Sequence, residues 1–128
     1  MIVVDASALV LAVVDNTMRG VAVADAVSQG AVAPHLIDAE LGHALRGLVR
    51  RAVISSDEAL RSLHAGQHLV ATRTGHRDLT ARAWELRDNV SFYDALYVAL
   101  AELRGLTLVT ADGRLAAASG PRCPIEVV

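Results

Sequence analysis

The 128-residue sequence predicts an α/β fold with helices on both faces of a mainly parallel sheet, as a three-layer α/β/α sandwich. Short β-branched runs alternate with longer helical patterns along the chain. The composition is 53% apolar but only 3% aromatic, which suits Ala, Val and Leu helices on a Val-rich sheet. The length suits one hydrophobic core, so residues 1–128 are expected to form a single domain.

Four segments are predicted to be strands. Residues 2–4 form a β-branched run that ends at Asp5 and gives way to a helical pattern. Residues 31–34, 107–110 and 125–128 are the other three. Because helical segments separate these runs, a mainly parallel arrangement is expected.

Helices are predicted between the strands. The first covers residues 7–14, and the second begins near Thr17 and is closed by Gly30. Two later helices cover about residues 79–89 and residues 92–104. Ser91 is expected to cap the last of these, and Gly105 stands where a helix commonly ends.

Two consecutive long helices form the middle of the chain. The first runs from about His35 to Arg51, and the second starts at a capping box of Ser55 and Glu58 and runs to about Thr72. Together they exceed what a minimal crossover between parallel strands requires. We therefore expect a projecting helical hairpin between Pro34 and Arg73, and we regard it as a candidate partner surface.

The charged and sulfur-containing residues exclude several classes of chemistry. Lysine is absent, which removes Schiff-base and P-loop mechanisms, and the net charge of −2 argues against a protein that coats nucleic acid. Cys123 is the only cysteine, so no internal disulfide can form and a cytoplasmic protein is expected. The apolar segment at residues 2–14 is interrupted by Asp5 and is too short to span a membrane.

Two acidic residues follow predicted strands. Asp5 comes after residues 2–4, and Asp112 comes shortly after residues 107–110. Ligands of open α/β sheets lie beyond the carboxyl ends of the strands, so both carboxylates would face one crevice if their strands are neighbours. Each aspartate, considered singly, is equally explained as the cap of the helix that follows it.

Two further acidic residues lie on helices. Asp94 belongs to a helix that is apolar on nearly every side, where an ionised carboxylate needs a cation or several donors. It is also explained as part of a capping motif opened by Ser91. Glu40 stands at the edge of an apolar stripe beside Ala44 and Gly47, and alone it would pass for a solvated glutamate.

The four acids together favour a metal site. Carboxylate oxygens are the ligands that Mg²⁺ and Mn²⁺ prefer, and clustered carboxylates repel one another unless a cation is present. Such an ion also supplies the electrophile for phosphodiester hydrolysis. The sequence therefore predicts a Mg²⁺ site, in which Mn²⁺ can substitute, within this group of four carboxylates.

Four segments carry a resemblance to a known family. They are Val-Val-Asp5-Ala-Ser7, Asp38-Ala-Glu40, Tyr93-Asp94-Ala-Leu-Tyr97 and Thr110-Ala-Asp112. In this order they resemble the PIN-domain ribonucleases, and most of all the VapC-type toxins of bacterial toxin–antitoxin pairs. The resemblance spans nearly the whole chain.

The resemblance implies a function and partners. It implies a divalent-metal endoribonuclease that is a homodimer and is inhibited by a cognate VapB-type antitoxin. We expect hydrolysis of a structured RNA, with Asp5, Asp94 and Asp112 holding one or two ions and Glu40 orienting the attacking water. Ser7 would position a ligand or water beside the metal.

Two rival functions are weighed against this hypothesis. A phosphoaspartyl enzyme or receiver domain also has acids at strand ends, but it would need a second acid beside Asp5 or a lysine, and neither is present. A catalytically silent PIN-like interaction module is the other alternative, and the complete set of four acids argues against it.

Other residues with chemical potential remain open or are assigned to the core. His64 and His68 are one helical turn apart but lack a third ligand. The aromatic residues Trp84, Tyr93 and Tyr97 are expected in the core rather than stacked on bases. Arg46, Arg50 and Arg51 either form a solvated face or contact RNA phosphates.

Overall fold

The structure is a computed structural model that describes all 128 residues. Its centre is a five-stranded parallel sheet in the order β3-β2-β1-β4-β5. The strands are β1 (Ile2–Val4), β2 (Ala31–Pro34), β3 (Thr72–Thr74), β4 (Leu108–Thr110) and β5 (Ile125–Val127). The mainly parallel sheet of the sequence prediction is thus parallel throughout.

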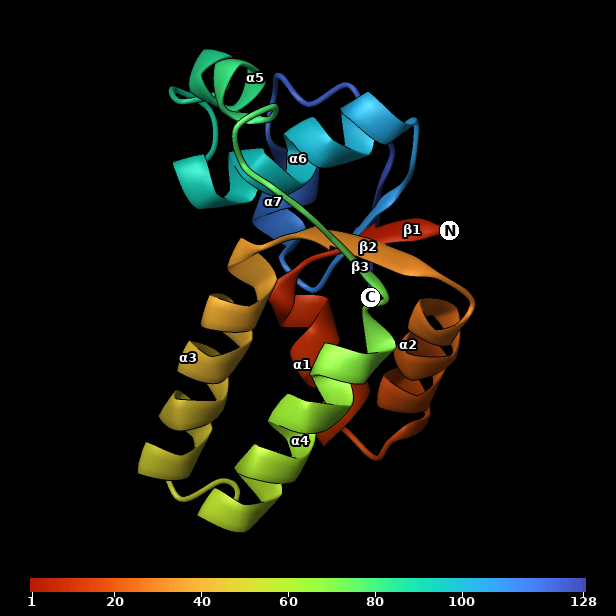
Figure 1. Cartoon of the computed structure of the whole chain (residues 1–128), viewed down its shortest axis with the longest axis vertical. Helices are drawn as coiled ribbons and strands as arrows, with labels where there is room; N and C mark the ends of the chain where they lie inside the picture. The colour runs from red at the N-terminus through yellow and green to blue at the C-terminus, as the bar shows by residue number, and fades with distance from the viewer.

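Helices cover both faces of the sheet. They are α1 (Ala6–Val14), α2 (Met18–Ser28), α3 (Leu36–Arg50), α4 (Ser56–Leu69), α5 (Thr80–Glu85), α6 (Phe92–Arg104) and α7 (Gly113–Ala117). Figure 1 shows α1 to α4 below the sheet and α5 and α6 above it. The predicted three-layer α/β/α architecture is confirmed.

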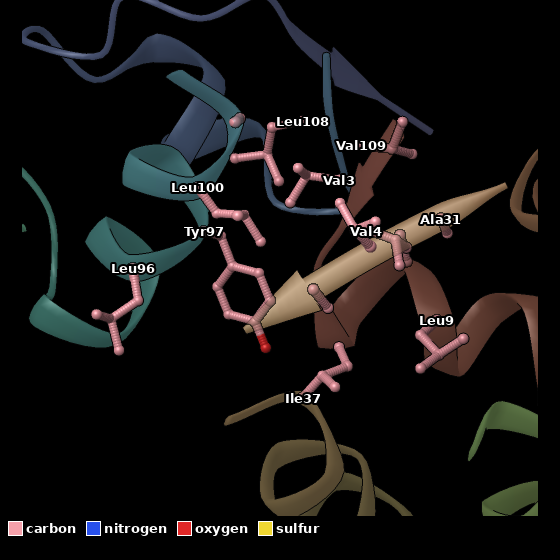
Figure 2. Close-up of a cluster of buried hydrophobic side chains, with 14 of the residues drawn as sticks. Val3, Val4, Leu9, Ala31, Ile37, Leu96, Tyr97, Leu100, Leu108 and Val109 are labelled. Carbon is pink, nitrogen blue, oxygen red and sulfur yellow. The ribbon is translucent and has the colours of Figure 1, made fainter. Parts of the chain in front are cut away.

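The core lies on both faces of the central strands. Val3, Val4 and all four residues of β2 are buried, as expected for parallel strands covered on both sides. From α6, the side chains of Tyr97 and Leu100 face these strands (Figure 2), and Leu96 is buried as well. Small residues on α6, among them Ala95, Ala99 and Ala101, are also buried and let the helix approach the sheet closely.

The structure differs from the sequence prediction at three places. The helix predicted over about residues 79–89 is shorter and ends at Glu85. Helix α4 ends at Leu69 rather than at about Thr72, and Thr72–Thr74 pairs with β2 as an edge strand that was not predicted. This strand is short and half-exposed, and its sequence Thr-Arg-Thr lacks the apolar alternation that predicts a strand. The five-residue α7 after Asp112 was not predicted as a separate helix.

The predicted helical hairpin is confirmed. Figure 1 shows α3 and α4 side by side and extending away from the sheet. Their packing is close, because a Cβ on Gly66 would lie 2.5 Å from a methyl carbon of the buried Leu41. At the base of the hairpin, Arg73 donates to both oxygens of Asp38 at 2.6 and 2.8 Å and to the carbonyl of Val70.

No single helix has the length and apolar character needed to cross a membrane. The pair α1 and α2, bent by 115°, meets the criteria together by length and composition only.

Candidate active site

Asp5 lies at the centre of the candidate site, directly after β1. Its backbone N–H donates to the carbonyl of Val109 on β4 at 3.1 Å, so the neighbouring strand fixes its position. Its carboxylate accepts from the N–H of Ala8 at 2.9 Å and caps α1. The side chain is 5% exposed. Asp5 therefore caps α1 and also lies at the candidate site, so the two roles considered for it from the sequence do not exclude each other.

Two hydroxyl groups orient the Asp5 carboxylate. Ser7 Oγ donates to Oδ1 at 2.6 Å, and Thr110 Oγ1 donates to Oδ2. Ser7 Oγ also accepts from the N–H of Ala111 at 2.8 Å, which ties the loop after β4 to the start of α1. Thr110 is fully buried. Sequence reasoning included Thr110 in a motif but gave it no role, although a threonine that ends a strand beside an acid is the signal.

Asp112 follows β4, whose neighbour in the sheet is β1, so the two predicted strand-end acids do lie at one edge. Its N–H donates to Thr110 Oγ1 at 3.0 Å, and its carboxylate accepts from the N–H of Arg114 at 2.9 Å. The Arg114 guanidinium lies 3.5 Å from Asp112 Oδ1 but is 95% exposed. Such an exposed pair neutralises the carboxylate only weakly.

Asp94 lies in the first turn of α6. Its N–H donates to Ser91 Oγ at 3.1 Å, as the capping motif predicts, and its own carboxylate is half-buried. Burial raises the pKa of Asp94, and the negative charges of Asp5 and Asp112 add to this rise. The Ser91 hydrogen bond opposes it. Capping and proximity to the other acids are both present.

Glu40 reaches the site from the second turn of α3. Burial raises its pKa, and the charges of Asp94 and Asp5 raise it further, while a hydrogen bond from Tyr97 acts in the opposite direction. That bond joins Tyr97 Oη to Glu40 Oε1 at 2.6 Å. Figure 2 shows the Tyr97 ring within the core and its hydroxyl directed toward the start of α3.

The structure brings the four predicted acids into one electrostatic group. Asp5 influences both Glu40 and Asp94, and Asp94 is also influenced by Asp112. No lysine exists to balance them, and Arg114 is the only cation that contributes at Asp94. Carboxylates that repel one another in a partly buried crevice favour the binding of a cation.

The donor set has the composition of a magnesium site but does not enclose an ion by itself. Only carboxylate and hydroxyl oxygens are present, which are hard ligands. No three carboxylate, histidine or cysteine side chains converge closely enough to hold a metal ion. Mg²⁺ in phosphoryl-transfer enzymes is commonly held by one or two carboxylates, with water and substrate phosphate as further ligands. The residues therefore fit Mg²⁺ on these terms.

Several secondary predictions are settled by the structure. Tyr97 is buried as expected, whereas Trp84 and Tyr93 are 61% and 62% exposed, so their assignment to the core was wrong. Trp84 lies on the short surface helix α5, and Tyr93 lies in the exposed first turn of α6. His64 and His68 gain no third ligand.

The comparison with known families decides the classification. A model of the PIN domain matches residues 2–121. The chain belongs to the PIN-domain family. Over the same range, the PIN domain contains all four acids of the carboxylate cluster and the hairpin of α3 and α4.

Relatives of this PIN domain are VapC proteins. Ribonuclease VapC1 of Mycobacterium tuberculosis is 44% identical over 128 residues, with 98% of this chain and 96% of the relative covered. Ribonuclease VapC9 of the same species is 42% identical, with 100% and 98% covered. The PIN domain described here is thus of the VapC type.

Two solved structures share the fold. PAE2754 from Pyrobaculum aerophilum aligns with a TM-score of 0.75 and 26% identity, covering 98% of this chain and 82% of that chain. Mycobacterium tuberculosis VapC20, described as a sarcin–ricin loop cleaving toxin, aligns with a TM-score of 0.65 and 21% identity, covering 91% and 94%. The latter likeness concerns the fold.

Proposed function

We propose that this protein is the toxin of a toxin–antitoxin pair and acts as a divalent-metal-dependent endoribonuclease. The observation that carries the proposal is the group of four acids at the carboxyl edge of β1 and β4, drawn from four separate segments of the chain. The names of the VapC relatives, which are ribonucleases at 42–44% identity, support the same activity.

The chain's own residues would act as follows. Asp5, Asp94 and Asp112 would hold Mg²⁺ or Mn²⁺, and Ser7 and Thr110 keep the Asp5 oxygens directed through their hydrogen bonds. A divalent ion bound there supplies an electrophile for the phosphate oxygens and makes water more acidic.

Glu40 is the group best suited to orient the attacking water. Tyr97 occupies Oε1, so Oε2 remains to accept a hydrogen bond from water. The water oxygen would form the new bond to phosphorus and give its proton to Glu40. The bond from phosphorus to one ester oxygen would break, and the departing oxygen would take up a proton from solvent. The raised pKa of Glu40, which burial and the neighbouring acids cause, makes it a better proton acceptor than an ordinary glutamate.

The substrate we propose is a structured RNA. Net charge is −2, so broad binding to phosphate backbones is not favoured. VapC20, which shares the fold, is described as cleaving the sarcin–ricin loop. A loop of a structured RNA, where nucleotides are unstacked, is therefore the substrate to test first.

We further propose that a VapB-type antitoxin binds the hairpin and that the toxin is a homodimer. A hollow of about 330 Å³ lies between α3 and α4, lined by Leu45, Val49, Leu60 and Leu63 together with Arg46 and Arg50. Leu60 is 54% exposed there, so an amphipathic helix of the antitoxin has apolar surface to cover. Other exposed apolar residues, such as Met18 and Val21 on α2, are available for dimerisation.

The deciding experiment is cleavage of total RNA by the purified protein, with the RNA ends mapped by sequencing. Cleavage should disappear with chelator and return with Mg²⁺ or Mn²⁺. Asp5→Asn should abolish it, whereas Asp88→Asn, which alters an exposed acid outside the site, should not. Undiminished cleavage in excess chelator, or by Asp5→Asn, would reject the proposal.

A further inference from the structure

Helix α3 has two grooves, one on each side. On the side of α1, two adjoining hollows of about 570 and 310 Å³ share Ser7, His43 and Ala44 in their walls. On the side of α4 lies the separate hollow with Arg46 and Arg50. The α1 groove, as we name the two joined hollows, has no lining residue in common with the α4 side.

The α1 groove follows one continuous face of α3. Its lining residues from this helix are Leu36, Ala39, Glu40, His43, Ala44, Gly47 and Leu48, and Arg51 follows as the residue that ends the helix. Their spacing of three and four residues is that of a single helical stripe. At a rise of 1.5 Å per residue, the eleven steps from Glu40 to Arg51 correspond to roughly 16 Å. The groove is therefore long enough for several nucleotides of a single strand rather than for one nucleotide.

The two ends of the α1 groove differ in chemistry. One end opens on the carboxylate cluster, because Glu40 and Ser7 form part of its wall, and there Tyr93 presents its exposed side chain beside Leu36 and Ala39. At the other end is Arg51, whose Nη1 lies 3.7 Å from the position of a Cβ on residue 47. The exposed ring of His43 lies between them.

We infer that the α1 groove binds the RNA strand on one side of the bond that is cut. The inference rests on the proposed ribonuclease function. Tyr93 stacks on the base next to the cluster, since an exposed aromatic ring on an apolar wall is the usual platform for an unstacked base. Arg51 pairs with a phosphate further along, and His43 offers ring nitrogens to the nucleotide between. This role gives a functional reason for the exposure of Tyr93, which the sequence pattern had not predicted.

Two features favour RNA over a protein as the occupant. The groove is continuous with the acids that would cut the phosphodiester. An RNA strand bound at the cluster must extend along a surface that starts there. It also ends in an arginine that makes no ion pair within the chain, as a phosphate ligand requires. The α4 side, by contrast, does not include any of the four acids.

The test is equilibrium binding of a fluorescein-labelled, mixed-sequence single-stranded RNA of about 12 nucleotides. Chelator prevents cleavage, a gel confirms that the RNA is intact, and anisotropy is followed from about 50 to 200 mM salt. Arg51→Gln should weaken binding roughly tenfold and reduce the slope of log K against log salt by about 0.7. Arg50→Gln, the same change one residue away on the α4 side, should alter neither quantity.

A second pair of variants tests the stacking contact. Tyr93→Ala should weaken binding roughly 5- to 150-fold, as loss of one stacked base predicts, and Tyr93→Phe should retain the parent affinity. Arg51 and Tyr93 are both exposed, so their variants are expected to fold, and thermal unfolding checks this.

The outcomes separate the groove from the nuclease. Three results would each overturn RNA binding in the α1 groove. They are equal losses of affinity for Arg50→Gln and Arg51→Gln, parent affinity in Tyr93→Ala, and no measurable binding to the wild-type protein. Loss of a co-expressed small protein partner from Arg51→Gln, with RNA binding intact, would overturn it in favour of a protein interface. Binding of the probe as expected, together with total RNA that stays uncut when Mg²⁺ is added, would instead reject the ribonuclease and keep the RNA-binding groove.

Discussion

The hydroxyl of Tyr97 on α6 donates a 2.6 Å hydrogen bond to Oε1 of Glu40 on α3, and this contact joins the two helical layers across the end of the sheet. Tyr97 is otherwise buried in the core, at 1% exposure. Its ring therefore belongs to the packing of the fold while its hydroxyl belongs to the site. The position of Glu40 is set by the core itself.

Replacing Tyr97 by Phe should change the pH dependence of cleavage. The hydrogen bond stabilises ionised Glu40 and so lowers its pKa against the effect of burial. Without the bond this pKa rises further, and the acidic limb of the profile of kcat/KM against pH should move to higher pH. The free energy of unfolding should fall by about 1 kcal/mol. An unmoved acidic limb in a folded variant would contradict the role of Glu40 as the group that accepts from water.

Asp94→Asn should abolish cleavage while the fold is kept. The amide is nearly isosteric but binds a hard cation far less well. In the wild-type protein, Mg²⁺ should raise the melting temperature, because it binds the folded state only, and this rise should be smaller in the variant. Differential scanning fluorimetry with and without Mg²⁺ measures both, and a variant that folds, binds metal and cuts at the parent rate would refute the assignment.

The same variant should have a pH-dependent stability relative to wild type when metal is absent. The pKa of Asp94 is raised in the folded protein by burial and by Asp5 and Asp112, so keeping it ionised costs free energy at neutral pH. The wild-type protein therefore gains stability as the pH falls through the raised pKa toward the ordinary value of 3.8. Asp94→Asn should be the more stable protein at pH 7, and its advantage should shrink on acidification. Urea unfolding with chelator present measures the difference in free energy of unfolding between the variant and the wild type. A difference that grows toward low pH would contradict the raised pKa of Asp94.

Arg73→Ala should destabilise the protein through the base of the hairpin. Arg73 binds both oxygens of Asp38 and also the carbonyl of Val70 at the end of α4, and the pair is partly buried. Loss of these charged hydrogen bonds should lower the free energy of unfolding by about 1–3 kcal/mol. Arg77→Ala removes an exposed arginine without an ion pair and serves as the control. Equal stability of the two variants would show that the Asp38 pair contributes nothing.

Dimerisation and inhibition can be tested on the intact protein. Light scattering of the isolated chain should give twice the mass of 13.5 kDa, and a strict monomer would contradict the proposed dimer.

The small protein encoded next to this protein should bind it and suppress cleavage. Leu60→Asp, which places a charge in the α4-side hollow, should weaken that inhibition without affecting cleavage by the free toxin.

Much of the fold could be predicted because the pattern and the burial agree. The runs at residues 2–4, 31–34 and 108–110 are apolar on both sides, and parallel strands covered by helices have this composition. Strand β3 could not be predicted, since Thr72–Thr74 pairs on one side only and needs no apolar residue. Its pairing with β2 depends on where α4 returns the chain, which local sequence does not encode.

The candidate site was predictable in part for the same reason. Asp5 and Asp112 follow strands, and that position alone placed them at one edge once β1 and β4 proved to be neighbours. The link between Tyr97 and Glu40 spans 57 residues, and no local pattern reports a contact of that separation. Tyr93 was misassigned because helical spacing identifies a helix but does not tell which residues of its first turn remain outside the core.

The two faces of α3 have a consequence for how such proteins diverge. Residues that line the hollow between α3 and α4 and residues that line the α1 groove alternate along the same helix but do not coincide. If the antitoxin binds the α4 side and RNA binds the α1 groove, as proposed, substitutions such as one at Arg50 are expected to alter inhibitor binding while the residues that meet RNA stay unchanged. Two related proteins of this kind are then expected to differ in the antitoxin that inhibits them and still cut the same RNA.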